Sequence, residues 1–191
     1  MNEKRVYTFG NGQAEGNASM REVLGGKGAN LAEMNHIGVP VPPGFTITTD
    51  TCNEYYKVGQ QKIVELLADE VNAAVAHTEE LMNCKFGDPK NPLLVSVRSG
   101  ARASMPGMMD TILNLGLNDE VAAGMVEKTG NPHFVYDSYR RFVQMYGDVV
   151  LGMKPENKED IDPFEAIIEK VKEEQGVVLD KDLSVESLKK L

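Results

Sequence analysis

Two strand-like apolar runs enclose a long polar segment near the middle of the chain, and this arrangement constrains the fold more than any other stretch. Residues 93–97 precede the segment and residues 112–115 follow it. Short apolar runs bounded by turn residues are typical of buried strands. The segment between them is rich in arginine, serine and glycine, and it has little that could form a core. Guanidinium forks, hydroxyls and backbone N–H groups together suit a phosphate, so we expect this loop to bind one.

Predicted strands and helices alternate before residue 117. Period-2 and apolar runs predict the strands, and apolar residues at helical spacing predict the helices. Three prolines within residues 39–44 exclude a helix or a central strand there. The expected strands are residues 6–9, 45–49, 93–97 and 112–115, and the expected helices are residues 29–37, 49–56 (capped by Thr49 or Asp50) and 60–82. This order predicts a mixed sheet with helices, in an α+β fold.

The chain after Gly116 is predicted to be entirely helical. Helices are expected over residues 118–128, 134–150 and 162–174, with a last one capped by Ser184. We therefore divide the chain into an α/β subdomain (residues 1–117) and a helical subdomain (residues 118–191). No capping signal accompanies Leu191, so we expect the sequence to be a piece of a longer protein.

Composition narrows the choice of ligand and compartment. The 191 residues carry 29 acidic and 20 basic side chains, a net charge of −9, which argues against a nucleic-acid partner. No apolar run approaches the roughly 20 residues of a membrane span, and the N-terminus lacks a signal peptide. We expect a cytoplasmic protein without a membrane partner. Cys52 and Cys84 are expected to be free thiols, and the isolated histidines suggest no metal site.

A glycine motif, residues 25–28 (GGKG), precedes the predicted helix at 29–37. Its glycines would let the backbone approach a ligand, and the helix N-terminus offers N–H groups and a partial positive charge. Lys27 adds a mobile cation. The spacing is not that of a P-loop. A plain glycine turn with a surface lysine is the alternative.

Arg98 follows the apolar run at 93–97, where an arginine could grip a phosphate with two hydrogen bonds. A structural arginine–carboxylate pair is the alternative. Residues 104–109 (SMPGMM) combine chain-breaking residues with flexible methionines, as expected of a mobile lid over a nucleotide. The alternative is an apolar loop buried under the helical part.

Residues 136–142 (YDSYRRF) combine aromatic residues at helical spacing with two arginines. Core packing is the simplest role for the aromatic residues. Arg140 and Arg141 are placed to form ion pairs with Asp137, and Arg141 could instead reach the nucleotide.

Five segments in order resemble the N-terminal nucleotide-binding domain of the pyruvate phosphate dikinase family. They are residues 16–20, 24–34, 41–49, 94–117 and 136–142, and they span most of residues 6–150. The water dikinases that make phosphoenolpyruvate share the Gly-Gly-Lys and Val-Arg-Ser elements. Their loop resembles an acidic version, whereas residues 100–110 favour the phosphate-using enzyme.

The resemblance implies an ATP-grasp-like domain with ATP and Mg²⁺ as ligands, the Mg²⁺ ligands lying outside this chain. Lys27 and Arg98 would bind the ATP phosphates, and the loop at 104–111 would cover the γ-phosphate. ATP would give its β-phosphate to a histidine elsewhere in the parent enzyme, and inorganic phosphate would take the γ-phosphate. The expected ATP-binding residues are Lys27, Arg98, Gly107, Met108, Met109, Asp110 and Thr111, with weaker candidates at Gly26, Ser99, Ser104 and Arg141.

The chain departs from the family because it lacks the phosphohistidine motif and the pyruvate-binding barrel. We therefore expect no catalytic residue here, an inactive fragment, and partners in the remaining domains of a parent enzyme that is itself a homo-oligomer. Two alternatives stay open. One is a water dikinase or related ATP-grasp phosphotransferase, and the other is a stand-alone nucleotide-binding or regulatory module.

Overall fold

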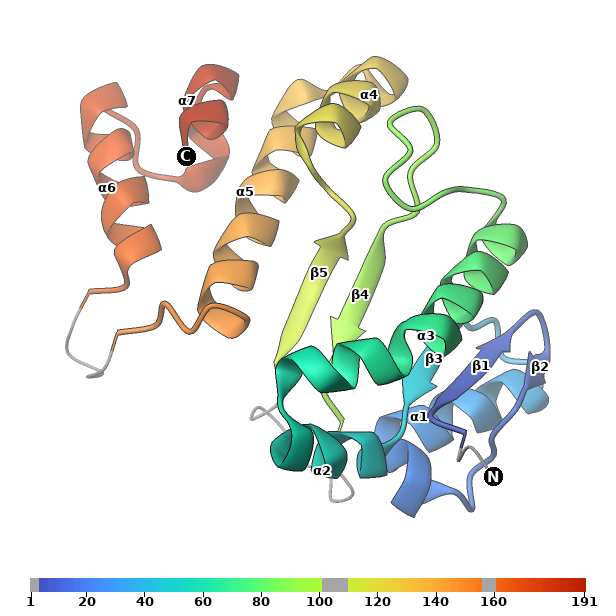
Figure 1. The fold of residues 1–191 in the computed structure, drawn as a ribbon. Coiled ribbons are helices and arrows are strands. Elements are labelled where there is room, and N and C mark those ends of the chain that lie inside the picture. The colour runs from blue at the N-terminus through green and yellow to red at the C-terminus, as the bar shows by residue number, and fades with distance from the viewer. Residues whose placement is uncertain (1–3, 101–109, 156–160) are drawn as a thin grey trace. The chain divides into compact units, whose positions relative to one another are not determined.

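The computed structural model describes residues 4–100, 110–155 and 161–191 and has the α+β fold that the sequence predicts (Figure 1). These residues form two compact units, one holding residues 4–84 with Ser99 and Gly100, the other the remainder. The strands are β1 (Val6–Gly10), β2 (Gln13–Ala14), β3 (Gly44–Ile47), β4 (Val95–Arg98) and β5 (Thr111–Leu115). The helices are α1 (Arg21–His36), α2 (Thr49–Val58), α3 (Gln60–Met82), α4 (Asp119–Thr129), α5 (Pro132–Val149), α6 (Pro163–Gln175) and α7 (Val185–Lys190), with a 3₁₀ turn at Asp180–Asp182.

The sheet of the first unit has the strand order β2-β1-β3, and both pairings are antiparallel. Helices α1 and α3 cover its opposite faces. Thr46 of β3 packs against Gly28 of α1, whereas Thr8 of β1 lines a shallow pocket with Leu81 of α3. Tyr7 is the register partner of Thr46, so its neighbour Thr8 points to the other face.

Helix α1 begins earlier than predicted and includes the glycine motif. The predicted start at residue 29 was wrong, because the helix runs from Arg21 and only Gly25 leaves the helical path, with φ 68° and ψ 172°. A residue without Cβ adopts this positive φ with little strain. A second helical segment therefore starts after Gly25, with Gly26 and Lys27 in its first turn.

Helix α2 is capped one residue before the predicted positions. The Thr48 hydroxyl accepts a hydrogen bond from the N–H of Thr51, which satisfies one of the free donors of the first turn. Thr49 and Asp50 are helical, so the prediction of either as the cap was wrong. Helix α3 has the predicted bounds.

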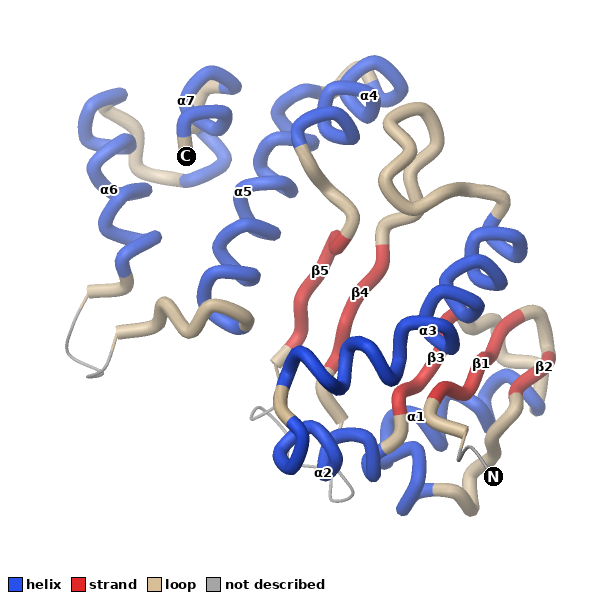
Figure 2. The backbone as a smooth tube through the Cα atoms, in the orientation of Figure 1, coloured by secondary structure: helices blue, strands red, loops and turns tan. Residues whose placement is uncertain are grey.

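Strands β4 and β5 form a two-stranded antiparallel ribbon in the second unit (Figure 2). The prediction of a buried strand at 93–97 was wrong in position and burial: β4 ends on Arg98, and Val97 is 45% exposed. Helix α5 packs on β5. A ribbon of two strands covered in this way leaves apolar side chains such as Val97 and Leu113 at the surface.

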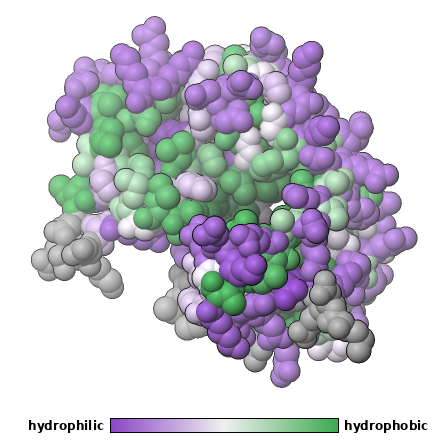
Figure 3. All heavy atoms as spheres, viewed as in Figure 1, coloured by the Kyte–Doolittle hydropathy of each residue, from purple (hydrophilic) through white to green (hydrophobic). Residues whose placement is uncertain are grey.

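The described residues after Leu115 contain helices and connections but no strand, as predicted (Figure 2). Ile168, Leu183 and Leu188 form a buried cluster against which Tyr136 packs. The aromatic stripe of α5 is only partly core, because Tyr146 remains 37% exposed. Apolar side chains are also visible at the surface of this unit (Figure 3).

The boundary between the two compact units does not fall at residue 117 of the sequence. Strand β4 pairs with β5, and β5 packs on α5, so the ribbon belongs with the helices rather than with the first sheet. The assignment of nucleotide-binding and helical subdomains on either side of residue 117 stays a prediction. None of the helices in the described ranges combines the length and the apolar character needed to cross a bilayer.

Candidate nucleotide-binding residues

The glycines of the 25–28 motif have three different structural roles. Gly25 makes the kink in α1. A Cβ on Gly28 would lie 2.7 Å from Thr46 Cγ2, so this glycine permits close packing of α1 on β3 rather than the approach of a ligand. Among the described residues, no atom outside its chain neighbours and the backbone of its own helix lies within 4 Å of the position of a Cβ on Gly26. Gly26, unlike Gly28, therefore has space beside it among the described residues where a ligand could approach the backbone.

Lys27 contacts the start of the polar loop. Its Nζ donates a hydrogen bond of 2.9 Å to the backbone carbonyl of Ser99, which is 72 positions away in the chain. The contact lies within the first unit. It brings together two motifs that the sequence could only place separately, and it leaves two of the three ammonium protons for other acceptors.

Arg98 is the last residue of β4 and lies opposite Thr111, the first residue of β5. Residues directly opposite one another in an antiparallel pair project from the same face. Arg98 is exposed, and none of the described carboxylates of its unit forms an ion pair with it. The alternative of a structural arginine–carboxylate pair therefore gains no support from the described part of this unit.

Asp110 lies beside Thr111 and forms an ion pair with Lys154, with 3.6 Å between Asp110 Oδ1 and Lys154 Nζ. Sequence reasoning missed Lys154, because its segment after α5 has no motif. Ser104, Gly107, Met108 and Met109 lie outside the described residues.

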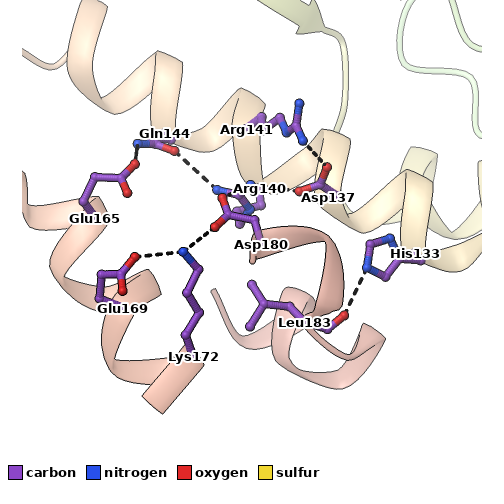
Figure 4. Close-up of polar contacts among 10 residues, drawn as sticks. All are labelled: His133, Asp137, Arg140, Arg141, Gln144, Glu165, Glu169, Lys172, Asp180 and Leu183. Atoms are coloured by element: carbon purple, nitrogen blue, oxygen red, sulfur yellow. Dashed lines mark hydrogen bonds and ion pairs between the residues drawn. The ribbon is translucent and has the colours of Figure 1, made fainter. Parts of the chain in front are cut away.

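Arg140 and Arg141 of α5 both bind Asp137, as predicted (Figure 4). Each nitrogen–oxygen distance is 2.8 Å. The two arginines differ in exposure, since the Arg140 side chain is 6% exposed and that of Arg141 is 62% exposed. Arg140 also reaches Asp180 at 3.3 Å. Arg140 is therefore structural, and Arg141 keeps an exposed guanidinium.

Asp180 joins two helices through two cations (Figure 4). It binds Arg140 of α5 and Lys172 of α6, and Lys172 also binds Glu169. The hydrogen bond from Lys172 lowers the pKa of the Asp180 carboxyl despite partial desolvation, and the same bond raises the pKa of Lys172. The network therefore favours the charged form of both groups.

Asp180→Asn is expected to destabilise the second unit at neutral pH by about 1 kcal/mol or less, because the Asp180 side chain is 38% exposed and water screens its pairs. Asp180 has a lowered pKa when folded, so its contribution is present above the ordinary value of 3.8 and is lost as the pH falls through the folded pKa. Urea unfolding should show the difference between the two proteins at pH 7 and its progressive decline as the pH falls below 3.8. A difference that does not decline below pH 3.8 would contradict the ionic explanation.

No group of three His, Cys, Asp or Glu side chains among the described residues could hold a metal ion. Both cysteines are free, Cys52 being exposed and Cys84 half-buried.

The comparisons with known proteins agree on one family. The family described as "Pyruvate phosphate dikinase, AMP/ATP-binding domain" matches residues 21–141. The chain is 57% identical over 188 residues to the pyruvate, phosphate dikinase of Clostridium symbiosum. The aligned region covers 98% of this chain and 20% of that protein. It is 52% identical over 189 residues to the chloroplastic pyruvate, phosphate dikinase of Flaveria trinervia (99% of this chain, 19% of that protein). It is also 52% identical over 181 residues to the enzyme of Rhizobium meliloti (95% of this chain, 19% of that protein).

The chain thus spans about a fifth of the length of the curated relatives it matches. The matched range includes the glycine motif, both strands of the ribbon and the arginine pair of α5. On this evidence the chain belongs to the pyruvate phosphate dikinase AMP/ATP-binding domain family.

Proposed function

We propose that this chain is part of the ATP-binding domain of a pyruvate phosphate dikinase, and that Lys27 and Arg98 bind the phosphates of ATP. The parent reaction would convert ATP, pyruvate and phosphate to AMP, phosphoenolpyruvate and diphosphate through a phosphohistidine outside this chain. The names of the relatives favour this reaction over that of a water dikinase. Their length favours it over a stand-alone module.

The hydrogen bond from Lys27 to the Ser99 carbonyl is the observation that carries the assignment of residues. It supports a single phosphate-binding role for the glycine motif and the loop that follows β4. The ammonium group would neutralise phosphate charge as a compact point charge. Gly26, with open space beside it, would let phosphate oxygens approach the N–H groups of the first turn after the kink.

Arg98 would supply a rigid fork for two phosphate oxygens. Thr111 is opposite it in the ribbon and could donate its hydroxyl from the same face. Positioning and charge neutralisation are the main requirements of phosphoryl transfer, and these side chains supply both. Asp110, Ser99, Arg141 and the loop residues Ser104, Gly107, Met108 and Met109 belong to the same proposal.

Mg²⁺ is proposed only for the parent protein. The described residues offer no set of ligands for it, so we derive no step through the ion. The resemblance assigns its ligands to parts of the protein outside this chain. The phosphohistidine and pyruvate-binding domains as partners, a homo-oligomeric parent and a cytoplasmic location are parts of the same proposal.

Product analysis of the protein translated from the complete gene tests the proposed reaction. We expect AMP and phosphoenolpyruvate to form only when inorganic phosphate is present, with one diphosphate released for each AMP. Formation of AMP and phosphoenolpyruvate without added phosphate, with orthophosphate as the other product, would instead identify a water dikinase. Tight binding of ATP without either reaction would favour a regulatory module.

A further inference from the structure

A narrow hollow lies between helices α5 and α6 of the second unit. Its lining includes Val143 of α5, Phe164 and Ile167 of α6, and Leu191. The volume of this α5–α6 hollow is about 20 Å³, which is room for the tip of one apolar side chain. Side chains of a third helix commonly fill such holes where helices pack together. The hollow therefore has the size and lining that suit an apolar side chain of another helix.

The apolar side chains at the α5–α6 hollow are exposed in the described part of the second unit. Val143 is 42% exposed and Ile167 is 54% exposed. Tyr146 and Val150 follow Val143 at helical spacing, so they extend the same face of α5, and both are also exposed. Apolar residues are visible at the surface of this unit (Figure 3). Adjoining exposed apolar side chains commonly mark an interaction surface, whereas single ones do not.

The packing around the α5–α6 hollow is incomplete within the described residues. Arg140 lines the hollow, and its side chain is 6% exposed. Its Nε is buried and has no hydrogen-bond acceptor among the residues that the structure describes. Unpaired buried donors are uncommon in complete folds. The orphaned donor and the exposed apolar side chains therefore occur at the same place.

The polypeptide that follows Leu191 in a longer protein is well placed to cover the hollow. Leu191 lines the hollow and directly follows α7, which packs on α5. The region aligned with the Clostridium symbiosum relative is only 20% of that protein. Under the proposed function, the parent protein therefore supplies further chain beginning at the hollow itself.

We propose that the α5–α6 hollow is a docking site for a helix that follows Leu191 in the complete protein. This inference rests on the proposed function, because that function makes the chain a part of a longer polypeptide. An apolar side chain of the docked helix fills the hollow, and its neighbours cover Val143 and Ile167. The exposed face of α5 is thereby buried in an interface within one polypeptide.

Thiol labelling of the complete protein measures whether the hollow is covered. Ile167→Cys puts a thiol on its wall, and the control is Val178→Cys, which lies outside the hollow and is 82% exposed. Each rate of reaction with iodoacetamide is divided by the rate of the same thiol in urea, and the exposed Cys52 is the reference within each variant. We expect the thiol at position 167 to react at least roughly tenfold more slowly than that at position 178.

Photocross-linking identifies the covering segment. Benzoylphenylalanine at position 167 is expected to cross-link to residues after Leu191 of the same polypeptide, as located by mass spectrometry. Equal labelling rates at positions 167 and 178 overturn the inference, and so do cross-links only to a second copy or only to residues before Leu191. Product analysis of the unmodified protein tests the proposed function separately. A protein that gives the expected cross-link without dikinase activity refutes the proposed function alone.

Discussion

Lys27→Ala is expected to lower ATP-dependent phosphorylation of the complete protein roughly 100-fold, while phosphorylation by phosphoenolpyruvate stays unchanged. The variant loses a charged donor to the phosphates, which is worth up to about 3 kcal/mol. The pyruvate half of the reaction does not involve this chain in our proposal, so it provides an internal control. The measurement is incorporation of ³²P into the protein from β-labelled ATP and, separately, from labelled phosphoenolpyruvate.

Two further variants show whether charge and position both matter at residue 27. Lys62→Ala removes another lysine of the first unit, one that pairs with Glu65 on the surface of α3, and it should leave both labelling reactions unchanged. Lys27→Arg keeps the charge and should recover part of the ATP reaction. An equal loss of both labelling reactions in Lys27→Ala would mean that the lysine supports the fold rather than the nucleotide.

Local sequence patterns predicted most of the secondary structure because they report local physical preferences. Helix α3 has the predicted bounds, since its apolar period is unbroken between Gly59 and Asn83. Ser184 caps a helix as predicted, because a side-chain oxygen before a helix satisfies its first N–H groups. Strand β2 was missed, because two residues give no period, and its pairing with β1 is a tertiary event.

The candidate site could be predicted only as separate motifs. The sequence identifies Lys27 and Arg98 as phosphate-binding residue types, but it does not show that Lys27 contacts Ser99. Nor does it distinguish Gly26, which has open space, from Gly28, which has Thr46 against it. Lys154 had no local signal at all, because its pairing with Asp110 depends on the path of the whole second unit. The motifs do not show which distant segments of the chain contact one another.

Gly124 is another residue whose role depends on a contact with a distant segment, and it is the subject of the last prediction. A glycine inside helix α4 would ordinarily cost up to about 1 kcal/mol relative to alanine. The fold explains its presence, because a Cβ at this position would lie 1.8 Å from the carbonyl oxygen of Pro89. A backbone atom cannot rotate away, so Gly124→Ala must push α4 away from the segment before β4. Such overpacking costs up to about 3 kcal/mol.

Hydrogen exchange of the complete protein, followed by mass spectrometry, measures this effect locally. In Gly124→Ala, protection of the amides in α4 and in residues 85–92 is expected to fall by roughly 100-fold, the equivalent of about 3 kcal/mol. Gly26→Ala is the matched control, because it also replaces a helical glycine, but among the described residues no atom outside its chain neighbours and its own helix backbone lies within 4 Å of the new Cβ. It should leave protection in α4 unchanged and hold α1 at least as firmly, since alanine is the better helix former. Unchanged protection in Gly124→Ala would mean that Pro89 and α4 are not in contact, and the packing of the second unit described above would then be wrong at this point.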